Sequence, residues 1–288
     1  MKALDSALQV LKLFATAETL SVGEITERLG LQKSNVSKVL AVYRDHGILQ
    51  QDPVTRRYRV GLAAFELGSA YARNHPVAHE ALSIMRELVD RCGHTATLSV
   101  KQGDLVLHLM AVEGPLYVDG RWRVGNRLAY HATSAGKVLV AGMSDDEVKE
   151  LLKRQPPYAI TPDTVTDPAL LKKQLRKIRE TGVAISRGES TQGLAAVAVP
   201  VFDASGRTVA ALGLIVPDHL YDDALGADMT RLLHEAARRL SVKLGASVYP
   251  FGDAHHAVTS ARGAASRRTS PVRARQRGTM REGSRDAG

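Results

Sequence analysis

The sequence predicts an α+β protein with a helical N-terminal region and a larger region built around an antiparallel sheet. Apolar residues in the first sixty positions repeat with the three-and-four spacing of amphipathic helices. Beyond Pro76, apolar segments of strand length are joined by tight-turn sequences, which predicts hairpins and therefore antiparallel pairing. Amphipathic helices separate these hairpins. This pattern is typical of α+β domains and not of a doubly wound nucleotide-binding fold.

The length and composition indicate an ordinary globular protein with more than one domain. The chain has 288 residues, of which 44% are hydrophobic and 24% are charged, and domains commonly hold roughly 100–200 residues. No apolar run approaches the ~20 residues that a membrane helix needs, and the N-terminus lacks the pattern of a secretory signal. The single cysteine, Cys92, excludes an internal disulfide framework and a cysteine-based zinc site. We therefore expect a cytoplasmic protein without a membrane partner.

Positive charge gathers at the two ends of the chain. The net charge is +9; residues 247–288 hold eight Arg and three acidic residues, and residues 1–60 hold nine Lys or Arg and six acidic residues. This asymmetry indicates a polyanionic partner. Residues 247–288 contain no Leu or Ile, so we expect a basic disordered tail that cannot bury enough apolar surface to fold. We favour an inert solvated extension over a nucleic-acid-binding arm.

Three helices are expected before residue 47. Ser21 and Glu24 form a capping box that begins the second helix, and Gly30 ends it. The third helix begins near Gln32 and ends before Gly47. The apolar positions that should face a common core are Leu4, Ala7, Leu8 and Leu11 in the first helix, Val22, Ile25 and Leu29 in the second, and Val36, Val39, Leu40 and Tyr43 in the third.

The opposite face of the third helix is small and polar, with no acidic residue before Asp45. Two helices joined by a tight turn, the second with an open polar face, are typical of a helix-turn-helix, whose second helix enters the major groove of DNA. Two short strands, 48–51 and 58–60, then surround a basic turn that could serve as a wing. A solvated face of a small helical bundle is the weaker alternative, because residues 31–60 hold six basic and two acidic residues. We expect Lys33, Ser34, Asn35, Ser37 and Lys38 to approach base edges or phosphates, and Arg44, Arg56 and Arg57 to fix the docking.

The remaining elements follow from turns and caps. A connecting helix over 61–75 ends before a proline, because the residue preceding proline resists helical torsions. Thr133-Ser134, Ser144 with Glu147, and Asp167-Pro168 mark later helix starts. The expected helices are 77–92, 135–141, one after Ser144, 168–182 and 222–244, and the expected strands are 95–101, 105–113, 194–202 and 207–216.

Several motifs occur in an order that is informative as a set. They are Lys33-Ser34 at the start of the third helix, Arg57-Tyr58-Arg59-Val60-Gly61-Leu62, Val124-Gly125-Asn126-Arg127-Leu128, His131-Ala132-Thr133-Ser134-Ala135-Gly136-Lys137, and Ala198-Val199-Pro200-Val201-Phe202-Asp203. Over roughly residues 2–246, the chain resembles the isocitrate lyase regulator (IclR) family of bacterial transcription factors.

The resemblance implies four segments: a winged helix-turn-helix at 1–61, a linker helix used in dimerisation at 62–75, a GAF-like antiparallel-sheet effector domain at 76–246, and the tail at 247–288. It implies a dimer or tetramer that binds double-stranded operator DNA and responds to a small organic acid. The family's pocket floor lies at a helix start, where free N–H groups and the helix dipole favour an anion. The implied pocket residues are Tyr117, Leu128, Ser134, Ala135, Ser186, Ala196, Gly213 and Ile215.

The chain departs from its apparent relatives at several pocket positions. Relatives that bind small keto acids resemble one another in placing Asp at Ser186, Cys at Ala196, and Ser at both Gly213 and Ile215. Losing those polar groups favours a bulkier, more apolar ligand, because a desolvated carboxylate needs several donors. Trp122 follows the strand near Tyr117, so we hypothesise an aromatic acid. Trp122 could equally be a packed residue of a dimer interface.

Other signals do not support an enzyme. Ala135-Gly136-Lys137-Val138 lacks the first glycine and the Ser/Thr of a phosphate-binding loop, and His79-Glu80 lacks the second histidine of a zinc-protease motif. Cys92 is expected to be a small buried thiol, and His108 a packed or pocket-lining residue without a catalytic role. We therefore expect no catalytic residue, cofactor or metal. The main alternative is a small-molecule hydrolase or isomerase carrying a helix-turn-helix, and the weaker one is a nonspecific nucleic-acid binder driven by its Arg tail.

Overall fold

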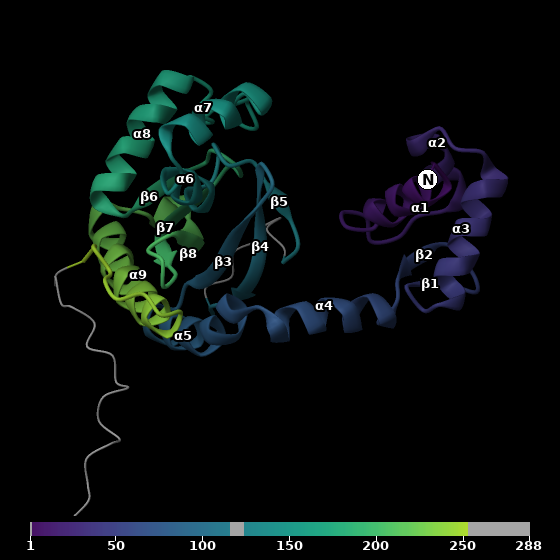
Figure 1. Ribbon diagram of the computed structural model, residues 1–288, viewed down its shortest axis with the longest axis horizontal. Coiled ribbons are helices and arrows are strands. Elements are labelled where there is room, and N and C mark those ends of the chain that lie inside the picture. The colour runs from purple at the N-terminus through teal and green to yellow at the C-terminus, as the bar shows by residue number, and fades with distance from the viewer. Residues whose placement is uncertain (1, 116–123, 253–288) are drawn as a thin grey trace, which may run out of the picture. The chain divides into compact units, whose positions relative to one another are not determined.

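The computed structural model describes residues 2–115 and 124–252 (Figure 1). It confirms the α+β class, with a helical N-terminal domain that includes a two-stranded ribbon and a larger domain built around a six-stranded sheet. The expectations for Tyr117, for Trp122 and for the chain from residue 253 onward lie outside the described residues.

The N-terminal domain has the helix-turn-helix arrangement that the spacing predicts. Its helices are α1 (Lys2–Leu13), α2 (Val22–Leu29) and α3 (Lys33–Asp45), and its ribbon pairs β1 (Leu49–Gln51) with β2 (Tyr58–Val60). The Ser21–Glu24 capping box is formed at the start of α2. Gly30 ends α2 with φ of 62°, a left-handed conformation that costs glycine little. The buried core residues are Val10, Phe14, Leu20, Ile25, Val36, Leu40, Leu49 and Tyr58.

The prediction for the buried face of α1 was partly wrong: Leu11 packs against the core as expected, but Leu4 and Leu8 do not. Leu4 and Leu8 are 68% and 47% exposed, whereas Val10 and Phe14 are buried. An apolar repeat of three and four residues gives two candidate faces on this helix, and contacts with the rest of the domain decide between them. The Tyr43 hydroxyl donates to the Ala7 carbonyl at 2.6 Å, which helps to fix how α1 lies against α3. Leu4 and Leu8 remain as open apolar surface.

Two consecutive helices follow the ribbon. Helix α4 (Leu62–Asn74) and helix α5 (Pro76–Cys92) are separated by His75, whose backbone is extended, as expected before proline. Helix α5 is amphipathic and buries one face in the larger domain. Helix α4 instead carries four large apolar side chains that are more than half exposed, namely Leu62, Phe65, Leu67 and Tyr71.

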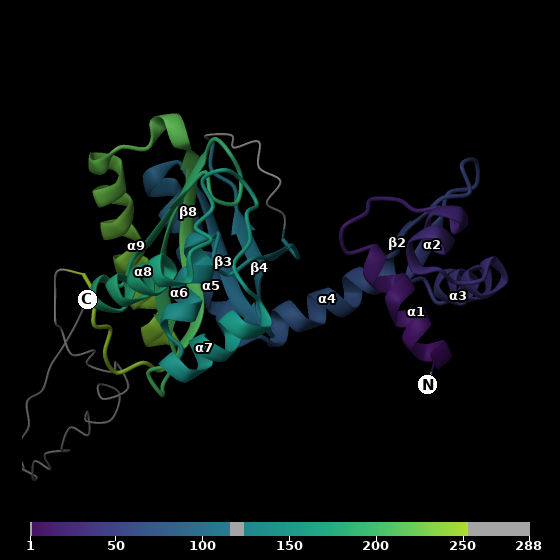
Figure 2. The ribbon, with the colours of Figure 1, turned by 90° about the horizontal axis from the view of Figure 1, so that it is seen from above.

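The sheet has the strand order β5-β4-β3-β8-β7-β6, and every neighbouring pair is antiparallel. In Figure 2, β8, β3 and β4 lie side by side. Two edge strands, β5 and β6, were not predicted, because strands of two and four residues are too short for an alternating pattern to be recognised. The strands are β3 (Thr95–Gln102), β4 (Leu105–Val112), β5 (Arg127–Leu128), β6 (Ala184–Arg187), β7 (Leu194–Phe202) and β8 (Thr208–Pro217).

Different helices cover the two faces of this sheet. Helices α5 and α9 (Asp223–Lys243) cover one face, and α6 (Ser134–Ala141), α7 (Asp145–Arg154) and α8 (Pro168–Thr181) lie on the other, as Figure 1 shows. A short 3-10 turn, Asp218–Leu220, precedes α9. The core under α5 and α9 includes Leu98, Val197, Leu212, Met229 and Leu233. The core under α6 and α8 includes Val106, Val138, Leu175, Ala198 and Ala211.

The expected start of a disordered tail at residue 247 is wrong for residues 247–252. Tyr249 is only 2% exposed, and its hydroxyl lies 2.9 Å from Nδ1 of His234 on α9. Phe251 packs against the same core, and the rings of Phe202 and Tyr249 meet edge to face. The sequence argument counted only Leu and Ile, so it overlooked two aromatic side chains that each bury a large apolar area.

Candidate functional site

The polar face of α3 is open in the structure. Val36 and Leu40 are buried in the domain core, whereas the five residues predicted to approach DNA are exposed. Gln32 precedes the helix and makes no side-chain capping bond, so the first N–H groups of α3 are open to an anion. The side chains of Lys33, Ser34, Asn35, Ser37 and Lys38 have no hydrogen-bond partner within the described residues.

The wing turn is shaped by Asp52 and Arg56. The Asp52 carboxylate accepts hydrogen bonds from the Val54 and Thr55 N–H groups, which lowers the pKa of Asp52. Arg56, with φ of 58°, is the only non-glycine residue in the left-handed region among the residues described. A non-glycine residue in that region is uncommon and indicates a tightly constrained turn. The Arg56 side chain is exposed at the tip of the wing.

Arg57 and Arg44 are engaged within the domain. The Arg57 guanidinium donates to both carboxylate oxygens of Glu24, at 2.8 and 3.0 Å, and to Thr19. Hydrogen bonds from the Ser21 N–H and from Arg57 lower the pKa of Glu24 to about 2. Arg57 therefore ties the base of the wing to the start of α2, a different role from the direct docking contact expected for it. Arg44 pairs with Asp45 at 2.8 Å on the exposed end of α3.

The larger domain contains a cavity of about 210 Å³ on the α6 face of the sheet. Seven of the eight residues that the resemblance implied for the pocket line this cavity; the eighth, Tyr117, lies outside the described residues. They come from β5, the start of α6, β6, β7 and β8. The seven are Leu128, Ser134, Ala135, Ser186, Ala196, Gly213 and Ile215.

The start of α6 forms one wall of this cavity. Thr133 caps the helix by accepting a hydrogen bond from the Gly136 N–H at 3.1 Å. A Cβ at Gly136 would lie 2.3 Å from the Tyr130 carbonyl oxygen, so this tight turn requires glycine. The N–H groups of Ser134 and Ala135 have no partner in the described chain. Unpaired N–H groups and the positive end of the helix dipole make this wall suited to a carboxylate.

No charged side chain lines the cavity among the described residues. The nearest basic residue along α6, Lys137, is 1% exposed and donates to both oxygens of Glu189, at 2.5 and 2.7 Å. Desolvation lowers the pKa of Lys137, and the Glu189 carboxylate opposes that shift. The Thr161 and Thr164 hydroxyls donate to main-chain carbonyls of the same loop, at Gly188 and Glu189. The ion pair therefore anchors the loop 188–194 to α6.

Sequence reasoning missed six of the fourteen described residues that line the cavity. The missed residues are Thr97, Thr133, Ser190, Thr191, Leu194 and Leu214. Strand register could have located one of them, because Thr97 pairs directly with Gly213 across β3 and β8. His108, expected to be packed or pocket-lining, lies in this wall.

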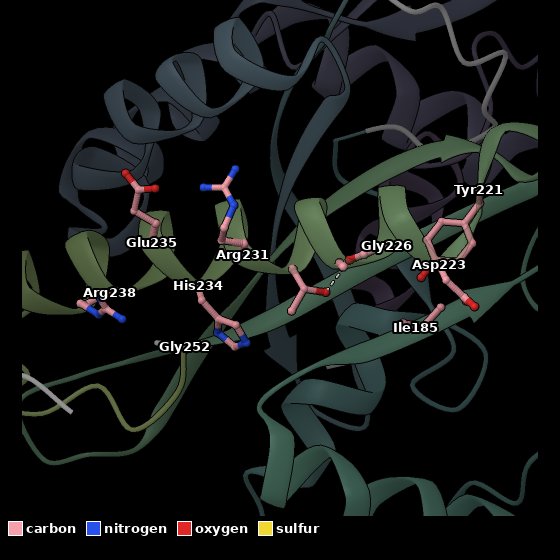
Figure 3. Close-up of a pocket in the computed structure, with 11 residues that line it drawn as sticks. Ile185, Tyr221, Asp223, Gly226, Arg231, His234, Glu235, Arg238 and Gly252 are labelled. Carbon is pink, nitrogen blue, oxygen red and sulfur yellow. Dashed lines mark hydrogen bonds between the residues drawn. The ribbon is translucent and has the colours of Figure 1, made fainter. Parts of the chain in front are cut away.

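A larger hollow of about 710 Å³ runs along α9 (Figure 3). Several of its polar side chains already have partners within the domain. Glu235 pairs with Arg91 and Arg231 with Asp228, and the His234 ring bonds to Tyr249. Nε of Arg238, which also lines the hollow, is buried without a hydrogen-bond partner within the described residues.

The described residues hold neither a metal-binding cluster nor a membrane-spanning helix. No group of three His, Cys, Asp or Glu side chains in residues 2–115 and 124–252 could hold a metal ion. Over the same ranges, no helix has the length and apolar character needed to cross a membrane.

The chain matches two models of known families. Residues 3–53 match the model described as "IclR helix-turn-helix domain". Residues 69–242 match the model described as "Bacterial transcriptional regulator IclR C-terminal".

Individual relatives match most of the chain. The HTH-type transcriptional regulator BhcR of Paracoccus denitrificans is 34% identical over 241 residues, which cover 84% of this chain and 86% of BhcR. The crystal structure of the Thermotoga maritima IclR is 29% identical with a TM-score of 0.70, covering 85% of this chain and 99% of that one. An IclR homologue from Microbacterium hydrocarbonoxydans, solved in complex with 4-hydroxybenzoate, is 26% identical with a TM-score of 0.73 and covers 84% and 98%.

Proposed function

Because the chain belongs to the IclR family of bacterial transcriptional regulators, we propose that it binds operator DNA as a dimer or tetramer and that a small organic acid in its cavity alters that binding. The families and relatives that it matches are transcriptional regulators, so the protein is a transcriptional regulator and not an enzyme. The observation that most supports the DNA contact is the polar face of α3, which is exposed while its apolar face is buried. Acting on operator DNA would place it in the cytoplasm.

In this proposal α3 enters the major groove N-terminus first, and Arg56 at the wing tip contacts phosphate. A symmetric dimer would then read two half-sites roughly 34 Å apart, or a multiple of that distance. Arg57 would act by holding the wing against α2, through Glu24. Arg44 would remain a candidate phosphate contact, since its partner Asp45 is itself exposed.

Gel-shift titrations at two salt concentrations test the DNA contact. Arg56→Ala should weaken binding to all sequences alike and lower the salt slope by about one. Asn35→Ala should instead relax the preference at particular base pairs. Lys149→Ala, an exposed lysine on α7, is the control and should change neither quantity. Unaltered affinity and preference in both test variants would overturn the proposed DNA face.

The exposed apolar residues of α4 support self-association. Leu62 and Phe65 are 71% and 70% exposed, and Leu4 and Leu8 on α1 add further open apolar surface. Exposed apolar surface of this kind is typical of a protein–protein interface. Phe65→Asp should weaken self-association in sedimentation equilibrium and reduce operator affinity, whereas Glu66→Ala on the same helix should do neither. An unchanged oligomeric state in Phe65→Asp would exclude α4 as the interface.

An aromatic acid is the effector that the cavity favours. Leu128, Ala196 and Ile215 give its wall an apolar part. The wall contains no basic side chain among the described residues, and the unpaired N–H groups at the start of α6 favour a negative charge there. The Microbacterium relative is described as complexed with 4-hydroxybenzoate. Calorimetry with benzoates, glyoxylate and pyruvate tests this choice. Tight binding of glyoxylate or pyruvate without binding of aromatic acids would refute it.

A further inference from the structure

His108 is a buried polar residue whose ring has one nitrogen in use. It lies on β4 in the wall of the cavity and is 6% exposed. Its Nδ1 lies 2.8 Å from Oγ of Ser99, the residue opposite on β3. Nε2 has no hydrogen-bond partner within the described residues. It is not one of the fully enclosed atoms, so a molecule can reach it. The remaining nitrogen is therefore available to a molecule in the cavity.

The Ser99 contact fixes which nitrogen carries the proton. Ser99 is fully buried, and His108 Nδ1 is the only partner found for its hydroxyl in the described chain. A buried hydroxyl that cannot donate loses a full hydrogen bond, so Ser99 donates to Nδ1. Burial lowers the pKa of His108 to about 4, so the ring is neutral near pH 7. The neutral ring then carries its proton on Nε2 and presents a single N–H donor.

His108 on β4 and the start of α6 both line the cavity. The hydroxyl of Ser186 on β6 donates to the Ala132 carbonyl at 3.1 Å, which holds the segment entering α6 over β6. Three strands, β7, β8 and β3, lie between β6 and β4 in the sheet. A ligand whose carboxylate meets the N–H groups of Ser134 and Ala135 shares the cavity with Nε2 of His108.

The charge balance restricts what that other end can be. The cavity holds no basic side chain among its described residues, and the start of α6 can stabilise one anionic group. A second carboxylate would be buried without a cation, which is costly. An uncharged oxygen can accept from Nε2 without that cost.

We propose that His108 selects the effector by donating a hydrogen bond from Nε2 to a second, uncharged oxygen, so that the preferred ligand is an acid that also carries a hydroxyl or carbonyl group. This inference rests on the proposed function of the cavity as the effector site. In this proposal the His108–Ser99 pair recognises the second oxygen of the effector.

Calorimetry on the full-length protein tests it with three probes: benzoate, 4-hydroxybenzoate and the dicarboxylate terephthalate. The wild-type protein should bind 4-hydroxybenzoate about tenfold more tightly than benzoate, because benzoate leaves the buried donor unpaired. Terephthalate should bind more weakly than either. His108→Leu should remove the preference for the hydroxy acid while leaving benzoate affinity within about twofold.

Two further variants separate recognition from folding. His108→Gln places an amide N–H near the position of Nε2 and should restore part of the preference. His219→Leu, an exposed histidine, should leave all affinities unchanged. Equal binding of the two benzoates to wild-type protein, or an unaltered preference in His108→Leu, would overturn the role of His108 alone. If neither acid bound to the wild-type protein, the proposed effector class would fail, and this inference with it.

Discussion

Replacing Lys137 by Met tests what the buried ion pair beside the cavity contributes. Lys137 and Glu189 are 1% and 8% exposed, and their charged atoms lie 2.5–2.7 Å apart. Removing one partner leaves an uncompensated buried charge, which costs about 3–5 kcal/mol in such pairs. Because domains are stable by only about 5–15 kcal/mol, this loss would be a large part of the total.

The double variant Lys137→Met/Glu189→Gln separates the cost of an unpaired charge from the value of the pair. Replacing both charges removes the desolvation penalty as well as the attraction, so the double variant should be more stable than Lys137→Met alone. Urea unfolding followed by far-UV circular dichroism at pH 7 measures both differences. Lys153→Met is a matched control, because Lys153 pairs with Glu150 on the surface with both side chains more than half exposed. That substitution should cost less than about 1 kcal/mol.

Two results would refute this reasoning. If Lys137→Met cost no more than Lys153→Met, the buried pair would not be holding the loop 188–194. If the double variant lost as much stability as Lys137→Met and Glu189→Gln measured singly and added together, the two side chains would act independently. The expected functional result is a weaker ligand affinity in Lys137→Met, because Ser190, Thr191 and Leu194 of that loop line the cavity.

Three further predictions follow from other contacts. Arg57→Ala should destabilise the N-terminal domain in thermal unfolding, whereas Arg56→Ala should not, because only Arg57 bonds to Glu24 and Thr19. Burial lowers the folded-state pKa values of His108 and His234 from 6.5 to about 4. The unfolded chain therefore binds protons first as pH falls, and each histidine should withdraw about 3 kcal/mol of stability between about pH 6.5 and 4. His234→Leu should reduce that loss in urea titrations at pH 7.5 and 4.5, and an unchanged pH dependence would contradict it. Gly136→Ala should abolish ligand binding in calorimetry, because a Cβ there would lie 2.3 Å from the Tyr130 carbonyl oxygen; retained affinity would show that the turn can move.

Local signals predicted the long elements well. Helix starts were readable wherever a side chain caps the first turn, as at Ser21, Ser144 and Asp167, and each of these caps is present. Strands β7 and β8 were readable because each holds a long apolar segment beside a turn. The elements that were not predicted depend on tertiary contacts. The short strands β5 and β6 exist through pairing with β4 and β7.

The polar face of α3 could be predicted from residue spacing, whereas the cavity could not. The open face of α3 followed from helical spacing alone, and the structure leaves that face exposed. The cavity positions came from resemblance, because residues as far apart as Leu128 and Ile215 meet only through the sheet register. The engagement of Arg57 with Glu24 was not visible, since the two residues lie 33 positions apart. The sequence alone does not distinguish a wing arginine that faces solvent from one that pairs with a carboxylate.

The cavity and the core beneath α5 and α9 lie on opposite faces of the same sheet. Mutations that change the size of the side chain at Ala196 or Gly213 alter the space available to a ligand, while their neighbours Val197 and Leu212 on the same strands pack beneath α5 and α9. Descendants of this gene could therefore exchange one chemical signal for another by changing a few codons, without rebuilding the scaffold behind them.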